Sequence, residues 1–278
     1  MKNRTTSAHT DRAISVIAQG SLRHLIPPNM PSHIAQLGNW EPRANYVITG
    51  KPDSGARPLV LTLAEKFAAS GGHIIWVGIT DDLARLCEQL MFKIAGLELP
   101  AVGTSVQLDG VSVCKLAFAH EQIGKMWIDF CNVDDCGDTQ VEQKFLASMS
   151  SFKPTLIVVD ESIFDEGTLN PFEILVRRTH VLHMVEELCG TNPMSSVLWH
   201  LPMRNEVASS VTMQRPSLDD LPDTASSIKP DVVLFTHRND GSDSIELIIA
   251  ANVYGPTGTV PLILDAKRAT WHEIDIAA

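Results

Sequence analysis

The sequence is poor in positive charge and has no long apolar run. Lys and Arg total 22 against 33 Asp and Glu, so the formal net charge is -11. A surface this negative repels phosphate backbones at long range, which disfavours tight binding of nucleic acid by the isolated chain. No apolar stretch reaches the ~20 residues of a membrane span, and residues 1–20 lack the apolar core of a signal peptide. We therefore expect a cytoplasmic protein that does not contact a membrane.

Cysteine is also scarce. The five cysteines are Cys87, Cys114, Cys131, Cys136 and Cys189. An odd, scattered set of this kind fits reduced thiols better than a disulfide framework. Cys131 and Cys136 lie close together, but no second Cys/His pair with the spacing of zinc ligands follows them. We therefore expect no metal site.

Hydrophobic residues are plentiful, at 44% of the 278 residues, which is enough for a sizeable buried core. From residue 45 onward, short apolar runs alternate with helical patterns. The expected strands cover 45–49, 73–78, 126–130, 154–159, 195–200, 231–236, 244–251, 259–264 and 270–275. The expected helices cover 58–70, 82–95, 139–150 and 171–189.

This alternation predicts an α/β protein with a mainly parallel sheet and helices on both of its faces. The turn residues at 239–241 and 255–258 predict that the last strands form an antiparallel extension. Residues 204–229 are polar and rich in Ser, Asp and Pro, which is typical of a long flexible loop.

The segment between the first strand and the first helix has the glycine spacing of a phosphate-binding loop. Its sequence is Gly50-Lys51-Pro52-Asp53-Ser54-Gly55-Ala56-Arg57. In such loops backbone N–H groups surround the phosphates, a lysine reaches the β- and γ-phosphates, and a hydroxyl binds magnesium. Ala56 stands at the lysine position and Arg57 at the hydroxyl position. Two interpretations stay open: Lys51 or Arg57 contacts phosphate instead, or Gly50 and Gly55 only form a strand-to-helix turn.

The strand expected over 154–159 ends in two acids, Asp160 and Glu161, in the form of a Walker B strand. Asp160 would hold magnesium through water, or it simply caps the following loop. An Asp-Glu pair here also leaves a route to hydrolysis, because some ATPases place the magnesium ligand and the water-activating base side by side. Against that route, Ala56 leaves the γ-phosphate unclamped, and loss of one electrostatic group typically costs about 10²–10³ in rate.

Several segments resemble, in order, the C-terminal motor domain of DnaB-type replicative helicases, which has a RecA-like P-loop NTPase fold. They are Ile26-Pro-Pro, Leu37-Gly-Asn-Trp-Glu-Pro, Lys51-Pro-Asp-Ser-Gly55, Gln214-Arg-Pro-Ser-Leu-Asp-Asp-Leu, Asp231-Val-Val-Leu-Phe-Thr-His-Arg238 and Gly255-Pro-Thr-Gly-Thr-Val260. The resemblance covers residues 20–276. It implies a linker-like helix within residues 1–25, with an apolar face at Ile14 and Ile17, and a RecA-like domain over residues 26–278.

Carried over by position, the resemblance implies that most of the catalytic apparatus is missing. The catalytic glutamate of the family falls at Thr80, and its γ-phosphate-sensing glutamine falls near His200. His200 could donate a similar hydrogen bond, or it is a satisfied histidine at a strand end. The Lys-x-Arg finger that a neighbouring subunit inserts falls at Ala251 and Val253.

The segment that resembles the DNA-binding loop of the family is altered as well. Pro222 stands where the family has an arginine, and Ala225 where it has a glycine. These changes remove a phosphate contact and a permissive backbone position, in agreement with the acidic net charge. We therefore expect weak or no binding of nucleic acid.

Together these features predict a non-catalytic pseudo-ATPase that acts in DNA replication through protein–protein contacts and needs no cofactor. The expected partner is a second copy of the chain or a DnaB-type replicative helicase. One alternative is an active motor that uses ATP and magnesium, with Asp160, Glu161 and a displaced basic residue. Another is a structural self-assembling oligomer unrelated to replication.

Overall fold

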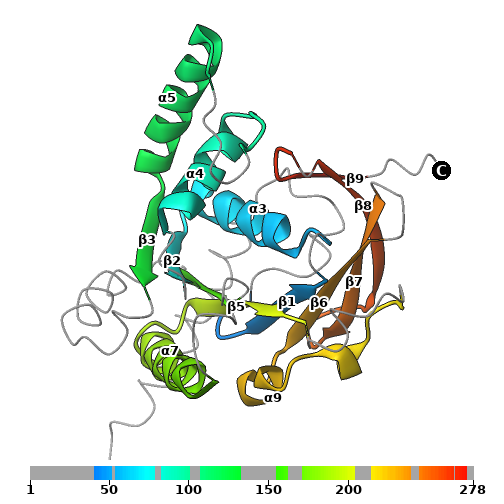
Figure 1. Ribbon diagram of the computed structural model, residues 1–278. Coiled ribbons are helices and arrows are strands. Elements are labelled where there is room, and N and C mark those ends of the chain that lie inside the picture. Colours follow the sequence, from blue (N-terminus) through cyan, green and yellow to red (C-terminus); the bar gives the residue numbers. More distant parts are fainter. Residues whose placement is uncertain are drawn as a thin grey trace, which may run out of the picture.

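The computed structural model describes residues 41–51, 54–78, 83–100, 107–132, 155–161, 171–203, 214–238, 244–265 and 267–273. Six strands run parallel to one another: β1 (Asn45–Gly50), β2 (His73–Gly78), β3 (Trp127–Asn132), β4 (Thr155–Asp160), β5 (Ser195–Pro202) and β6 (Val232–Arg238). Three strands continue the sheet in antiparallel fashion: β7 (Ser244–Asn252), β8 (Gly258–Asp265) and β9 (Thr270–Glu273). The order across this sheet is β3-β2-β4-β5-β1-β6-β7-β8-β9 (Figure 1). The mainly parallel sheet with an antiparallel extension is therefore confirmed.

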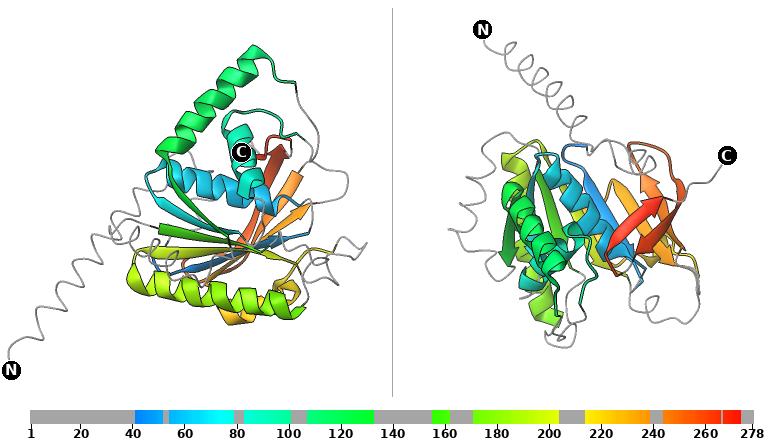
Figure 2. Two further views of the ribbon diagram at one scale, coloured as in Figure 1. Left: turned by 60° about the vertical axis from the view of Figure 1, so that its left-hand side comes forward. Right: turned by 90° about the horizontal axis from the view of Figure 1, so that it is seen from above.

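Helices cover both faces of the sheet (Figure 2). One face carries α3 (Ala56–Ala69), α4 (Leu83–Ile94) and α5 (Gly110–Lys125), whereas α7 (Pro171–Thr191) and α9 (Thr224–Ile228) lie on the opposite face. Reversal of the direction in which successive strands are added moves the connecting helix to the other face, because such crossovers are right-handed.

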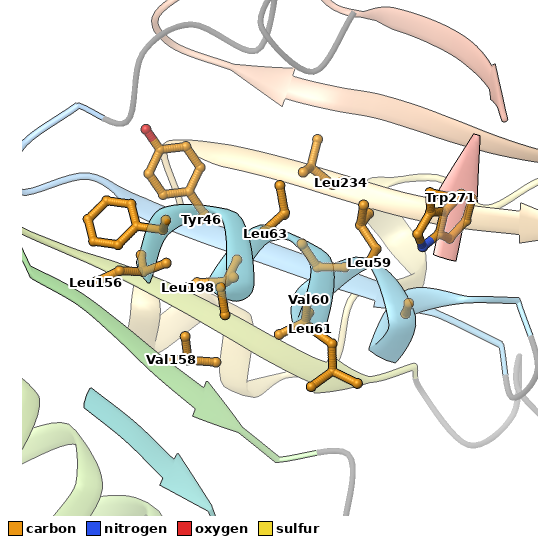
Figure 3. Packing of buried hydrophobic residues seen from close by; sticks show 14 of the residues in the cluster. Tyr46, Leu59, Val60, Leu61, Leu63, Leu156, Val158, Leu198, Leu234 and Trp271 are labelled. Carbon is orange, nitrogen blue, oxygen red and sulfur yellow. The ribbon is translucent and has the colours of Figure 1, made fainter. Parts of the chain in front are cut away.

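The strands are buried on both faces, so two separate cores form. Successive residues of a strand point to opposite faces, and Val158 and Leu198 accordingly pack with α3, while Val159 and Val197 pack with α7. Figure 3 shows the α3 side, where buried residues of the helix meet the strands and Trp271 of β9. This alternation also fixes the face to which each residue at a strand end points.

Most expected elements are confirmed to within a few residues, with two differences. The helix α5 was not expected, and the long flexible loop predicted over 204–229 is wrong for its described part, residues 214–229. There a short 3-10 helix, η2 (Leu218–Asp220), precedes α9. Ala225 and Ile228 of α9 are buried in the core beneath α7, so apolar packing orders a segment whose overall composition is polar.

Some expectations fall outside the described residues. They are the helix over 139–150, the linker-like helix at the N-terminus, Thr80 and Cys136. The four cysteines that the structure describes are free thiols.

Candidate functional site

The candidate site lies at the carboxyl ends of the parallel strands. In open α/β sheets this edge is where ligands usually bind. Here β5 lies between β1 and β4, so His200 pairs in register with Ile48 on one side and with Asp160 on the other. The end of β1 also meets β6, where Gly50 is opposite Thr236. The fold therefore brings the altered phosphate loop, His200 and Asp160 to one edge.

Gly55 begins α3, and its environment explains why it must be glycine. Its φ is 90°, in the left-handed region that side chains rarely adopt. A Cβ added to it would also lie 2.7 Å from Trp271 Cζ2 and 2.8 Å from Leu264 Cδ2. Both backbone conformation and packing against the sheet extension thus require this glycine, whether or not the loop binds phosphate.

The loop is also attached to β6 by a buried pair of hydroxyls. Ser54 Oγ lies 2.7 Å from Thr236 Oγ1, and both side chains are buried. Gly50 lies directly against this pair, because a Cβ added there would lie 2.2 Å from each hydroxyl oxygen. Sequence reasoning missed this contact, since nothing local connects two residues so far apart in the chain.

The cationic residues of the loop do not replace the missing lysine by position. Ala56 is only 7% exposed and lies in the first turn of α3. Lys51 and Arg57 are both half-buried, and the Nε of Arg57 makes no hydrogen bond with the residues that the structure describes. Pro52 lies outside those residues. A phosphate contact by Lys51 or Arg57 stays a prediction.

Asp160 and His200 form a hydrogen bond across β4 and β5. His200 Nδ1 lies 2.9 Å from Asp160 Oδ1, and the two residues are 4% and 0% exposed. By the alternation of the strands, both point to the face covered by α3, where the loop also lies. The sequence located these two residues at strand ends but did not indicate that they contact each other.

Glu161 points to the other face of the sheet. Its Oε2 lies 3.2 Å from Arg178 Nε, which belongs to α7, and its carboxylate is almost fully buried. Burial raises the pKa of Glu161 above its usual value, the nearby Arg178 lowers it, and Asp160 raises it further. The two acids that the sequence placed together therefore lie on opposite faces, and Glu161 is directed toward α7.

The remaining candidates lie away from this edge. Ala251 packs against a small cluster that includes Phe235, and Val253 is 71% exposed in the turn between β7 and β8. Pro222 is half-buried and its carbonyl accepts a hydrogen bond from the N–H of Ala225, which is buried in α9. Among the described residues no group of His, Cys, Asp and Glu could hold a metal ion, and no helix is suited to crossing a membrane.

No protein-family model matches the chain, and no curated protein matches it. Solved structures do. A solved ATPase domain of a DnaB-like helicase has a TM-score of 0.69 and 15% identity, covering 99% of this chain and 100% of that one. A DnaB-like replicative helicase, described with its interactions with primase, has a TM-score of 0.69 and 14% identity. That alignment covers 90% of this chain and 63% of the helicase chain.

A third structure, the RadB recombinase, has a TM-score of 0.54 and 12% identity, with 90% of this chain and 100% of that chain covered. At these identities the likeness concerns the fold. The strand order, the helices on both faces and the antiparallel extension agree with it. The chain therefore has the RecA-like fold that the ATPase domains of DnaB-like helicases have.

Proposed function

We propose that this chain is a non-catalytic, DnaB-like protein of the RecA fold that acts in DNA replication through protein–protein contacts. The observation that carries the proposal is Ala56 at the start of α3. A lysine there would hold the β- and γ-phosphates, and phosphoryl transfer depends chiefly on such electrostatic contacts. A methyl group in the first turn of α3 cannot make them.

The surroundings of the two acids support the same proposal. The active alternative needs Asp160 free to hold magnesium and Glu161 close to the reacting phosphate. Instead, Asp160 is hydrogen-bonded to His200, and Glu161 is paired with Arg178 on the face away from the loop. We therefore favour the inactive protein over an ATPase that uses these acids with ATP and magnesium.

The helix α5 supports a role in protein contacts. It projects from the body of the domain (Figures 1 and 2), and of its side chains only Ala119 is buried. Val111, Val113 and Phe118 are 65%, 51% and 60% exposed. An exposed apolar group of this kind is typical of a protein-binding surface. The proposed partner is a second copy of the chain or a DnaB-type replicative helicase, and binding of nucleic acid is weak or absent.

Two measurements test the proposal. The first is steady-state ATP hydrolysis beside a thermal melt with and without magnesium and ATP, because a ligand that binds the native state raises its melting temperature. We expect no turnover above background and no rise. Turnover that Asp160→Ala abolishes would overturn the proposal. The second is native mass spectrometry of the chain alone and mixed with a DnaB-type helicase. A monomer in both samples would contradict the proposed contacts.

A further inference from the structure

We propose that Asp160 and His200 are a structural pair that ties the end of β4 to the end of β5, so that the acid serves the fold and not a metal ion. The inference deepens the proposed function and rests on it in one respect. An acid committed to the histidine of the same domain is a physical reason for the absence of magnesium chemistry at this edge.

The position of the two residues in the sheet makes the contact a direct one. β4 and β5 are parallel neighbours, and Asp160 and His200 are register partners. Partner residues on adjacent strands project to the same face, which here is the face of Val158 and Leu198 beneath α3. The Nδ1–Oδ1 distance of 2.9 Å is that of a good hydrogen bond. An ionised carboxylate only accepts, so Nδ1 carries the hydrogen.

Burial makes this hydrogen bond consequential. Asp160 is 0% exposed, and a buried carboxylate is costly unless a polar or charged partner compensates it. In an active phosphate loop, the lysine and the metal ion supply that compensation. Ala56 cannot supply it here, and the imidazole of His200 donates to Asp160 instead.

The backbone around the pair is held in the same way. The N–H of Glu161 donates to the carbonyl of His200 at 2.9 Å, so strand pairing continues one residue beyond Asp160. Arg178 then contacts Glu161 from the face of α7. The end of β4 is thus held by His200 on one face and by Arg178 on the other.

A structural pair and a metal-binding acid respond differently to substitution. Residues kept for ligand chemistry often destabilise the free protein, so their removal raises the melting temperature. Removal of one partner of a buried hydrogen bond lowers it, because the other partner is left unsatisfied. For this chain we expect Asp160→Ala and His200→Ala each to lower the melting temperature by about 4 °C. The double variant should melt no lower than the worse single variant, because both lose the same interaction.

Conservative variants separate this contact from a general defect. Asp160→Asn keeps a carbonyl oxygen that can accept from His200, and His200→Gln keeps an N–H donor. Both should melt well above the alanine variants. Glu186→Ala, which removes an exposed acid of α7, is the control and should melt like the wild type. If the alanine variants do not fold while the conservative variants do, the structural role is supported.

The outcomes distinguish this inference from the proposed function. An Asp160→Ala variant that melts like the wild type, or above it, overturns the structural pair and leaves the proposed function standing. Equal melting temperatures for Asp160→Asn and Asp160→Ala also overturn the pair. Stabilisation of the wild type by magnesium and ATP overturns the proposed function, whatever the alanine variants do.

Discussion

The carboxylate of Glu161 and the guanidinium of Arg178 face each other across the junction of β4 and α7, with 3.2 Å between Oε2 and Nε. Despite this cation, the pKa of Glu161 is raised, because burial outweighs the attraction of Arg178. A buried ion pair of this kind stabilises a protein little or not at all, but loss of one partner is costly. This asymmetry gives a prediction for each residue.

The substitution Glu161→Gln should stabilise the protein at neutral pH. The pKa of Glu161 is higher in the folded than in the unfolded chain, so its contribution to stability is present below the unfolded value and is lost as pH rises through the folded value. Glutamine does not ionise and escapes this loss. Melting temperatures of the two proteins measured from pH 5 to pH 8 should diverge as the pH rises. A difference that shrinks with rising pH would contradict the raised pKa.

The substitution Arg178→Gln should have the opposite effect, because it leaves the Glu161 carboxylate buried without its cation. We expect a loss of about 2 kcal/mol in the free energy of unfolding at neutral pH, measured by urea denaturation. The double variant Glu161→Gln, Arg178→Gln serves as the control and should recover most of the loss. If the double variant is as unstable as Arg178→Gln, the two side chains do not act as a pair.

Gly55 and Gly71 form a matched pair of sites for alanine. Both have a φ near +90°, but Gly71 has open space where a Cβ would lie, whereas Gly55 packs against Trp271 and Leu264. Gly71→Ala should therefore cost about 1 kcal/mol from backbone strain alone. Gly55→Ala should cost about 3 kcal/mol, because overpacking adds to the strain. Equal losses in urea denaturation would show that the contact with β9 is unimportant.

The cysteines should differ widely in reactivity toward iodoacetamide at pH 8. Cys114 is exposed on α5, while burial raises the pKa of Cys189 to about 11. Only the thiolate reacts, so on the order of one Cys189 thiol in a thousand is reactive at pH 8. Peptide mass mapping at short times should find Cys114 modified and Cys189 intact. Protein unfolded in urea is the control, in which both should react; early labelling of native Cys189 would contradict its burial.

Phe118→Ser should weaken assembly or partner binding without affecting the fold. Phe118 is exposed on α5, so its removal costs the core nothing, and surface substitutions usually change stability by less than about 0.5 kcal/mol. An aromatic side chain in an interface typically contributes more than about 1 kcal/mol, which is roughly tenfold in affinity or more. Light scattering and native mass spectrometry measure the effect. His120→Ser, on the same helix, is the control; identical assembly of both variants would exclude this part of α5 from the contact.

The sequence located the strand ends but not the contacts between them. The acid at the end of β4 and the histidine at the end of β5 are where the apolar runs predict them, because such runs define strand boundaries well. The hydrogen bond between Asp160 and His200 depends on β5 lying beside β4. Strand order is a property of the whole topology, so spacing along the chain does not reveal it. The direction of Glu161 was missed for the same reason, since its partner belongs to α7.

The helix α5 was missed because its local pattern is misleading. Val111 and Val113 favour strands, and apolar residues occur on its exposed side, so the helical period is weak. A usable signal was present in Asp109, whose side chain accepts a hydrogen bond from the N–H of Ser112 and caps the helix. The overall fold was predictable because the strand-helix alternation is strong elsewhere.

The position of β1 in the sheet has a consequence for how the chain folds. β1 is the first described strand, yet its neighbours are β5 and β6, both of which lie beyond residue 194. Pairing of the central strands must therefore wait until most of the chain has been synthesised. Long-range parallel pairing of this kind slows folding and leaves apolar strands exposed meanwhile. We expect a slow folder that depends on chaperones during synthesis, with β1 as a segment prone to aggregation until β5 and β6 arrive.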